Sequence, residues 1–382
     1  MDISEKTHFV KNPHIPWRKP IFYGLVICSF LFMNGCKYGK DLAITESVDS
    51  LPRLSPGNAC FPKSSFHPGT SLICYYNPTI KTVFYETGIK KGKFLIKNHG
   101  EFVTFYPHTQ DSIFFMFRDS VILYNAKGDV LKSIFYQRKF THNGVLYRIG
   151  KTVLDVPNLC YNNKQQLLYL PCSNSETNWW EKDFFRNSML IVGLNIKTGL
   201  IQHFPLVRYP VEYSDECYGE LANYFYTLKD YNDMYISFNA LPSVYKYNLS
   251  SDRPEGLKIS LPDLKNVPVY DTGYKEDLNI VLEYQKRIDT YWKIIYDPFR
   301  KLFYRFHTQP TLNPQQKTHG SYPSNFDVIL IIYDEEFNEL KRFNFGDSVN
   351  HYGTFISYKG LHLKMFRPSD QYEYFKILHF SR

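Results

Sequence analysis

The chain has 382 residues and a formal net charge of +8, and 18% of its residues are aromatic while 21% are charged. This composition excludes an intrinsically disordered protein, because disorder requires few aromatic residues and a high net charge. It also excludes collagen-like and coiled-coil chains, which need a glycine period or a dominance of alanine, glutamate, lysine and leucine. The many tyrosine, phenylalanine, valine and isoleucine residues favour strands, so we expect a large β-rich fold.

The first predicted element is an apolar run of thirteen residues, 21–33, which follows Arg18 and Lys19. A transmembrane helix needs about 20 apolar residues, so this run is too short to cross a bilayer. Its length and its basic flank are typical of a secretory signal peptide. We therefore predict that residues 1–35 are a signal peptide, with a signal anchor or a buried apolar segment as the alternative.

The run ends in Met33-Asn34-Gly35-Cys36, and its Gly35-Cys36 pair resembles a bacterial lipobox. The resemblance implies cleavage before Cys36 and acylation of the Cys36 thiol. Two or three acyl chains attach a protein stably to a membrane, whereas one chain is marginal. We therefore expect a lipid-anchored protein of the cell envelope, at the outer membrane and facing either the periplasm or the cell surface.

Residues 36–59 are polar and contain Pro52, Pro56 and Gly57. We interpret them as a polar tether with room for one strand, followed by a single domain over residues 60–382. The positive charge is spread thinly, without the basic stripe that marks a nucleic-acid surface, so nucleic acid is not an expected partner.

Two turn types recur after residue 60. The first ends a strand with Asn or Asp and places Gly, Asn or Asp a few residues later, as at Asn125, Asn195, Asn248 and Asp334. The second places an aromatic residue before Asn or Asp, as at Asn77, Asn162 and Asp297. These residue types suit tight turns, because they tolerate positive φ or cap the turn with their own side chains. The two types alternate, which indicates repeating four-stranded units of propeller size.

We therefore predict an all-β fold, a β-propeller with six blades, with seven blades as the alternative count and a β-sandwich as the alternative fold. The expected blades cover about 60–100, 101–140, 141–210, 218–262, 275–345 and 350–382. An open ring would leave unpaired strand edges, so we expect a strand from the N-terminal segment to complete the last blade.

The lipobox, together with a propeller rich in Tyr and Phe and with Tyr-[Asn/Asp]-Pro turns, resembles a family of uncharacterised Bacteroidetes lipoproteins with six-bladed, TolB-like propellers. The resemblance covers residues 36–382 and implies the location and the fold. It implies no activity.

The cysteines permit two disulfides. An exported protein can form them, and closeness in sequence makes Cys60 with Cys74 and Cys160 with Cys172 the candidate pairs. Buried thiols acting as small apolar side chains are the alternative.

Linear catalytic signatures are absent from the sequence. It contains no G-x-S-x-G elbow and no H-E-x-x-H pair, so we predict no metal site, no cofactor and no catalytic residue. An insertion at 173–187 instead holds four aromatic residues among charged ones, and these are the candidate ligand-binding residues Trp179, Trp180, Phe184 and Phe185. Such residues are typical anchors for a sugar ring or for the apolar patch of a partner. The alternative is that the insertion folds back and seals a gap in the ring. A second insertion, 307–326, has the composition of a loop over one face.

The expected function is that of a non-enzymatic binding or scaffold protein, whose ligand is an envelope protein, a glycan or a peptide. The alternative is an envelope enzyme that acts on glycans or peptides at the central funnel of the propeller. A fold does not decide between the two, because function resides in the site.

Overall fold

The computed structural model describes residues 42–52, 63–64, 73–77, 81–86, 91–96, 100–109, 111–150, 159–215, 219–251, 256–261, 288–310, 326–365 and 372–381. All of them belong to one unit that begins at Leu42. The predicted signal peptide, Cys36, Cys60 and most of the second insertion lie outside the described residues. Within these segments, no helix has the length and the apolar character that crossing a bilayer requires.

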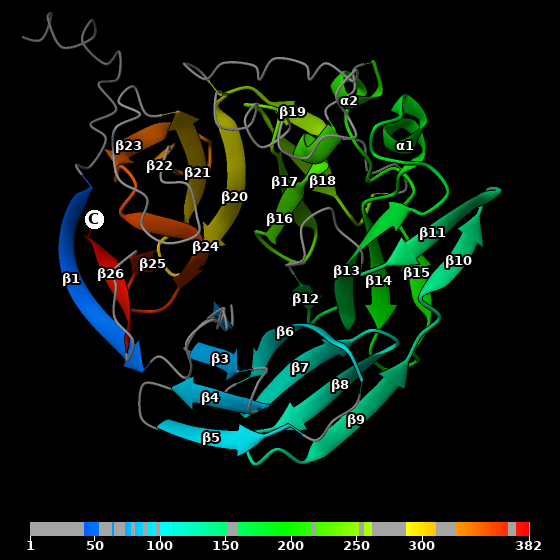
Figure 1. Ribbon diagram of the computed structural model, residues 1–382, viewed down its shortest axis with the longest axis horizontal. Coiled ribbons are helices and arrows are strands. Elements are labelled where there is room, and N and C mark those ends of the chain that lie inside the picture. Colours follow the sequence, from blue (N-terminus) through cyan, green and yellow to red (C-terminus); the bar gives the residue numbers. More distant parts are fainter. Residues whose placement is uncertain are drawn as a thin grey trace, which may run out of the picture. The chain divides into compact units, whose positions relative to one another are not determined.

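The described strands form six antiparallel sheets arranged as a ring (Figure 1). The first sheet holds β2 (Lys63–Ser64), β3 (Ile73–Asn77), β4 (Thr82–Glu86) and β5 (Lys91–Leu95). The second holds β6 (Phe102–Thr109), β7 (Ser112–Phe117), β8 (Ser120–Asn125) and β9 (Val130–Phe135). The third holds β10 (Lys139–His142), β11 (Val145–Ile149), β12 (Cys160–Asn162), β13 (Leu167–Asn174), β14 (Ile191–Asn195) and β15 (Ile201–His203).

The other three sheets each have four strands. The fourth holds β16 (Tyr224–Leu228), β17 (Asp233–Phe238), β18 (Val244–Asn248) and β19 (Leu257–Ile259). The fifth holds β20 (Thr290–Asp297), β21 (Leu302–Pro310), β22 (Phe326–Tyr333) and β23 (Glu339–Asn344). The sixth holds β24 (Val349–Ile356), β25 (Leu361–Met365), β26 (Tyr372–Ser381) and β1 (Ala43–Pro52). The prediction of an all-β propeller is therefore confirmed, and the described strands of this ring form six sheets.

The last blade joins the two ends of the described chain. β1 pairs with β26 over ten residues, from Ala43 opposite Ser381 to Pro52 opposite Tyr372. The expectation that an N-terminal strand completes the sixth blade is confirmed. The boundary at residue 60 is wrong, however, because residues 43–52 belong to the propeller and not to a tether. The side chains of residues 43–48 are mostly exposed on this outermost strand, and the sequence of β1 lacks the apolar alternation that identifies a half-buried strand.

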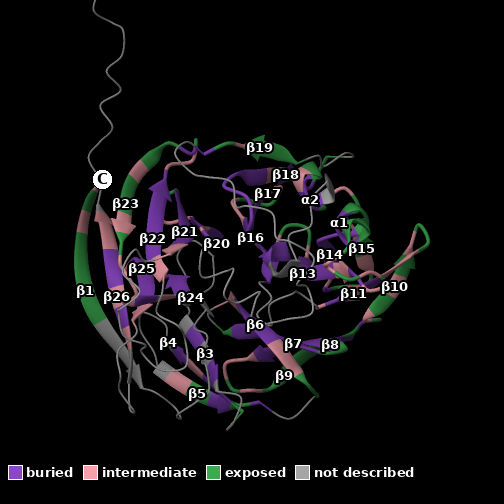
Figure 2. Cartoon of the chain, turned by 45° about the horizontal axis from the view of Figure 1, so that its top comes forward, coloured by how far each residue is buried: buried purple, intermediate pink, exposed green. Residues whose placement is uncertain are grey.

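The core lies between neighbouring blades. Phe115 of β7 shares a cluster with Val83 of the preceding blade, and Val121 of β8 shares one with Leu168 of the following blade. Every side chain of β7 is buried, whereas most of those on the outer strand β9 are exposed. Figure 2 shows the same gradient, with buried strands such as β7 and β22 inside and exposed strands such as β1 and β19 at the rim.

The first turn type has the geometry that its sequence predicts. Asn125 Oδ1 accepts hydrogen bonds from the amides of Lys127 and Asp129, both at 2.9 Å. Asn195 Oδ1 accepts two in the same way, at 2.9 and 3.0 Å. Gly128 in the first of these turns has φ +85°, a conformation that side chains disfavour.

The candidate disulfide between Cys160 and Cys172 does not form, because both residues are buried thiols. Cys160 lies opposite Tyr169 in the β12–β13 ladder, and Cys172 lies three residues further along β13. Side chains alternate between the two faces of a sheet, so the thiols enter different core clusters. Cys74 is also a buried thiol, and burial raises the pKa of both the Cys74 and Cys172 thiols.

Candidate functional site

The connection between β13 and β14 forms one wall of a cavity of about 290 Å³. Its lining residues are Ser173, Asn174, Ser175, Glu176, Thr177, Asn178, Trp179, Phe184, Tyr209 and Tyr224. This connection is the first predicted insertion. One side of the cavity is therefore a polar loop, and the other is a set of aromatic rings.

The polar loop is held by its own turns and by the neighbouring hairpin. Asn174 Oδ1 accepts a hydrogen bond from the Glu176 amide at 2.9 Å, and Asn178 Oδ1 accepts one from the Trp180 amide at 3.3 Å. The amide and the hydroxyl of Ser175 both donate to the main-chain oxygen of Leu146, at 2.9 and 3.0 Å. These contacts fix the backbone on both sides of Thr177 and preorganise the rim of the cavity.

The loop continues into the short helix α1 (Lys182–Asn187), which packs against α2 (Val211–Asp215). Phe184 and Phe185 of α1 contact Tyr209 with ring centroids 6.0 and 5.1 Å apart. Tyr209 in turn lies 6.0 Å from Tyr224, with the two rings nearly perpendicular. Aromatic pairs favour such tilted and edge-to-face arrangements, and they give the cavity a rigid apolar floor.

The tyrosine hydroxyls of this floor are engaged with main-chain oxygens. Tyr209 donates to Ala222 and Tyr224 donates to Leu190, both at 2.5 Å. Burial raises the pKa of both phenols, so they remain neutral donors at physiological pH. The floor therefore contributes neutral ring surface to the cavity.

The structure separates the four predicted aromatic residues. Trp179 and Phe184 line the cavity, and Trp180 does not. Both tryptophans are partly buried against the same core cluster. Phe185 is fully buried among the rings of α1 and α2, where it packs the core and does not line the cavity. The insertion therefore contributes Trp179 and Phe184 to the cavity lining and Phe185 to the core, and ligand binding by its aromatic residues stays a prediction.

Sequence reasoning missed Tyr209 and Tyr224, because they come from segments that only the folded chain brings to the insertion. The polar lining residues from Ser173 to Asn178 lie within the predicted insertion, but only the aromatic residues of that insertion were predicted to bind a ligand. In the described segments, no three His, Cys, Asp or Glu side chains come together in a group that could hold a metal ion.

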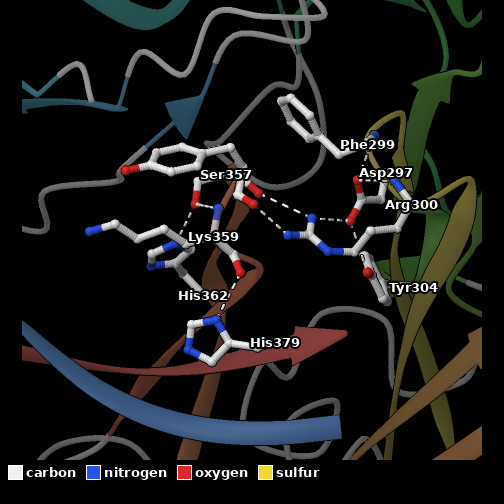
Figure 3. Close-up of polar contacts among 9 residues, drawn as sticks. Asp297, Phe299, Arg300, Tyr304, Ser357, Lys359, His362 and His379 are labelled. Atoms are coloured by element: carbon white, nitrogen blue, oxygen red, sulfur yellow. Dashed lines mark hydrogen bonds and ion pairs between the residues drawn. The ribbon is translucent and has the colours of Figure 1, made fainter. Parts of the chain in front are cut away.

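A second polar cluster lies where the fifth blade meets the sixth (Figure 3). Asp297 is fully buried, and its Oδ2 accepts hydrogen bonds from Arg300 and from the Tyr304 hydroxyl, both at 2.9 Å. Arg300 also donates to the main-chain oxygens of Ser357 and Tyr358, at 3.2 and 2.6 Å. Because its partners are backbone groups of the adjacent blade, this cluster connects blades.

The same cluster contains a serine and a histidine within hydrogen-bond distance, the arrangement of an activated nucleophile. Ser357 Oγ and His362 Nε2 are 2.7 Å apart, but both residues are at least 97% buried. Burial lowers the pKa of His362 to about 3, and the Lys359 amide donates to Ser357 Oγ at 3.0 Å. We interpret the pair as a structural contact that stabilises the β24–β25 hairpin, because the Ser357 hydroxyl already has hydrogen-bond partners and is buried.

The model of one protein family, described as a domain of unknown function (DUF4221), matches residues 97–341, more than half of the chain. A crystal structure of a DUF4221 member from Bacteroides vulgatus has a TM-score of 0.63 at 14% identity, over 90% of this chain and 99% of that one. A protein of unknown function from Bacteroides caccae has a TM-score of 0.40 at 12% identity, over 76% of this chain and 83% of that one.

Virginiamycin B lyase from Staphylococcus aureus has a TM-score of 0.42 at 7% identity, over 88% of this chain and 99% of that one. The last two likenesses are too weak to bear on this chain. No curated protein matches it significantly.

Proposed function

Given that the chain belongs to the DUF4221 family, whose function is unknown, we propose that it is a lipid-anchored envelope protein whose propeller binds a glycan. The single observation that carries the binding role is the cavity at the β13–β14 connection, in which a polar loop faces the rings of Trp179, Phe184, Tyr209 and Tyr224. A non-enzymatic role fits this lining, in which Glu176 is the single acidic residue.

The chemistry of the lining favours a sugar. The apolar face of a pyranose stacks on aromatic rings, while its hydroxyls need donors and acceptors such as those of Ser175 and Thr177. Thr177 Oγ1 is buried and has no hydrogen-bond partner among the described residues, so it is available to a ligand hydroxyl. The cavity volume of about 290 Å³ lies at the low end of ligand sites, which suits one sugar ring of a longer chain.

The sequence supports the anchor. Cys36 lies only seven positions before Ala43, the first residue of β1. A fully extended chain spans about 3.3–3.6 Å per residue, so acylation at Cys36 would tether the propeller within about 25 Å of the bilayer surface.

Metabolic labelling with an alkynyl palmitate tests the anchor. The full-length protein is expected to take up the label and to fractionate with membranes, whereas Cys36→Ser loses the label and is released. Cys28→Ser is the matched control, because Cys28 lies within the predicted signal peptide and should leave the labelling unchanged. Labelling that persists in Cys36→Ser refutes the anchor.

Calorimetric titration tests the binding role. The probes are glucose, galactose, mannose and N-acetylglucosamine together with their disaccharides. At least one is expected to bind saturably, and Trp179→Ala should weaken it about tenfold or more, which corresponds to about 1.4 kcal/mol. Trp180→Ala is the matched control, because it removes the same side chain from the adjacent position outside the lining. Equal weakening in both variants, or no saturable heat from any sugar, contradicts the proposal.

A further inference from the structure

Two neighbouring strands near the middle of the ring, β20 and β24, are both irregular where they face each other. Between the pairs Tyr291–His307 and Ile294–Arg305, β20 has two residues where β21 has one. This is a β-bulge, and it re-aims the side chains of Trp292 and Lys293. β24 has a larger irregularity, with residues 351–354 opposite a single residue of β25.

The two irregular segments contact each other across the boundary between the fifth and sixth blades. The Lys293 ammonium donates a hydrogen bond to the main-chain oxygen of Thr354 at 2.9 Å. The ring of Trp292 lies 4.7 Å from that of His351, and its Nε1 donates to Thr308 Oγ1 at 2.9 Å. Bulges concentrate next to active and binding sites, because they place side chains where regular strands would not.

Lys293 is a cation with no anionic partner among the described residues. Its ammonium has three N–H donors, and the Thr354 oxygen accepts one. Burial lowers the pKa of Lys293 to about 8, so the amine still carries its charge near neutral pH. Lys293 is partly buried, and a charge held partly out of water without a counter-ion costs stability, which a ligand that supplied the counter-ion would offset.

A second donor lies beside the lysine. Thr354 is 1% exposed, and its Oγ1 has no hydrogen-bond partner among the described residues. His351 is also buried, and burial together with the charge of Lys293 lowers its pKa to about 3, so its ring is neutral. The cluster therefore combines one positive charge, one available hydroxyl and an aromatic wall.

We propose that Lys293 and Thr354, held by the facing irregularities of β20 and β24, bind the carboxylate group of a small organic ligand. A carboxylate has one negative charge and two acceptor oxygens, which match one ammonium and one hydroxyl. Phosphate carries up to two charges, which a single ammonium matches less well than it matches one carboxylate. This site is separate from the cavity at β13–β14 and does not depend on it.

Thermal unfolding with and without succinate tests the site, with sodium chloride at equal ionic strength as the salt control. The melting temperature of the wild type is expected to rise saturably by about 2–4 °C as the ligand stabilises the native state. Lys293→Met should abolish this rise. Lys246→Met is the matched control, because Lys246 is a half-buried lysine that already pairs with Asp233 at 2.6 Å. It should keep the full response.

The unliganded melting temperatures distinguish a ligand site from a structural link between blades. Lys293→Met should melt no lower than the wild type, because it removes a partly buried charge that has no counter-ion among the described residues. Thr354→Val keeps the main-chain oxygen that Lys293 uses and removes only the hydroxyl, so it should reduce the response to succinate in a folded protein. The proposal is overturned if Lys293→Met responds like the wild type or melts several degrees lower. It is also overturned if phosphate stabilises the wild type as much as succinate does, or if succinate gives no saturable rise.

Discussion

Arg300 donates a hydrogen bond to the main-chain oxygen of Tyr358 at 2.6 Å, and thereby connects the β20–β21 turn to the β24–β25 turn of the next blade. Asn162 makes the equivalent connection two blades earlier, where its Nδ2 donates to the main-chain oxygen of Tyr231 at 2.6 Å. Both turns belong to the second type that recurs in the sequence. The Asn or Asp of this turn also accepts two amide hydrogen bonds of its own turn. The motif therefore shapes the hairpin and fixes its position against the neighbouring blade.

Arg300→Ala is expected to destabilise the propeller by about 3 kcal/mol, because it leaves the buried Asp297 carboxylate without its cation. The free energy of unfolding in urea measures this change. Arg342→Ala is the control, since its pair with Glu339 is about one-third exposed and should contribute less than about 1 kcal/mol. Similar losses in the two variants would contradict a role of Arg300 between blades.

Phe185→Ala is expected to cost about 3–5 kcal/mol, because Phe185 is fully buried in the aromatic cluster of α1 and α2 and its removal leaves a cavity. Trp180→Ala should cost less, because Trp180 retains exposed surface. Chemical unfolding of the two variants gives the comparison. If Trp180→Ala proves the more destabilising change, the assignment of Phe185 to the core fails.

Stability should fall as the pH drops below about 6.5, and His307 contributes to this fall. Burial first, and then the charges of Arg305 and Arg342, lower the pKa of His307 from 6.5 to about 4 in the folded state. The unfolded state therefore binds the proton more readily, so this stability is fully present above pH 6.5 and is lost as the pH falls towards about 4. The shift corresponds to about 3 kcal/mol in total.

His307→Phe tests this contribution, because phenylalanine can keep the stacking on Tyr291, whose ring centroid lies 5.0 Å from that of His307. The variant should lose less stability than the wild type between pH 7 and pH 5 in urea unfolding experiments. Parallel pH profiles for the two proteins would show that His307 is not the titrating group.

The thiols of Cys74, Cys160 and Cys172 should resist alkylation by a maleimide in the native protein and react after unfolding. All three are buried, and burial raises the pKa of the Cys172 thiol, which disfavours the reactive thiolate. Mass spectrometry of labelled peptides locates the modified residues. Because Cys160 and Cys172 form no disulfide with each other, these two residues should give no change in the melting temperature when a reducing agent is added. Detection of a peptide with a Cys160–Cys172 disulfide would contradict the structure.

The sequence predicts the blades well because each hairpin is a local event. Each strand–turn–strand unit depends on a short local stretch of sequence. The turns at Asn125 and Asn195 can therefore be recognised directly, and each lies in the blade that was predicted for it. Closure by an N-terminal strand follows from the need to pair the open edge. The sequence does not predict where β1 begins and ends, because a strand at the rim is largely exposed and its sequence therefore resembles that of a polar linker.

The sites are harder to predict because they are assembled from distant segments. The insertion identifies Trp179 and Phe184, but Tyr209 and Tyr224 join them only in the folded chain. Lys293 and Thr354 are sixty-one positions apart, and neither belongs to a recognisable motif. The absence of a disulfide between Cys160 and Cys172 depends on the face of β13 on which each thiol lies. That face is set by strand register, which spacing in the sequence does not reveal.

The pairing of β1 with β26 imposes an order on biosynthesis. β1 is translated long before its partner β26, so the sixth sheet cannot form completely until β26 has left the ribosome. An open ring keeps two unpaired edges and lacks the contacts of its final blade, which delays the commitment of the chain to its compact state. The blade that closes the ring is therefore the last of the six described sheets to gain all of its strands.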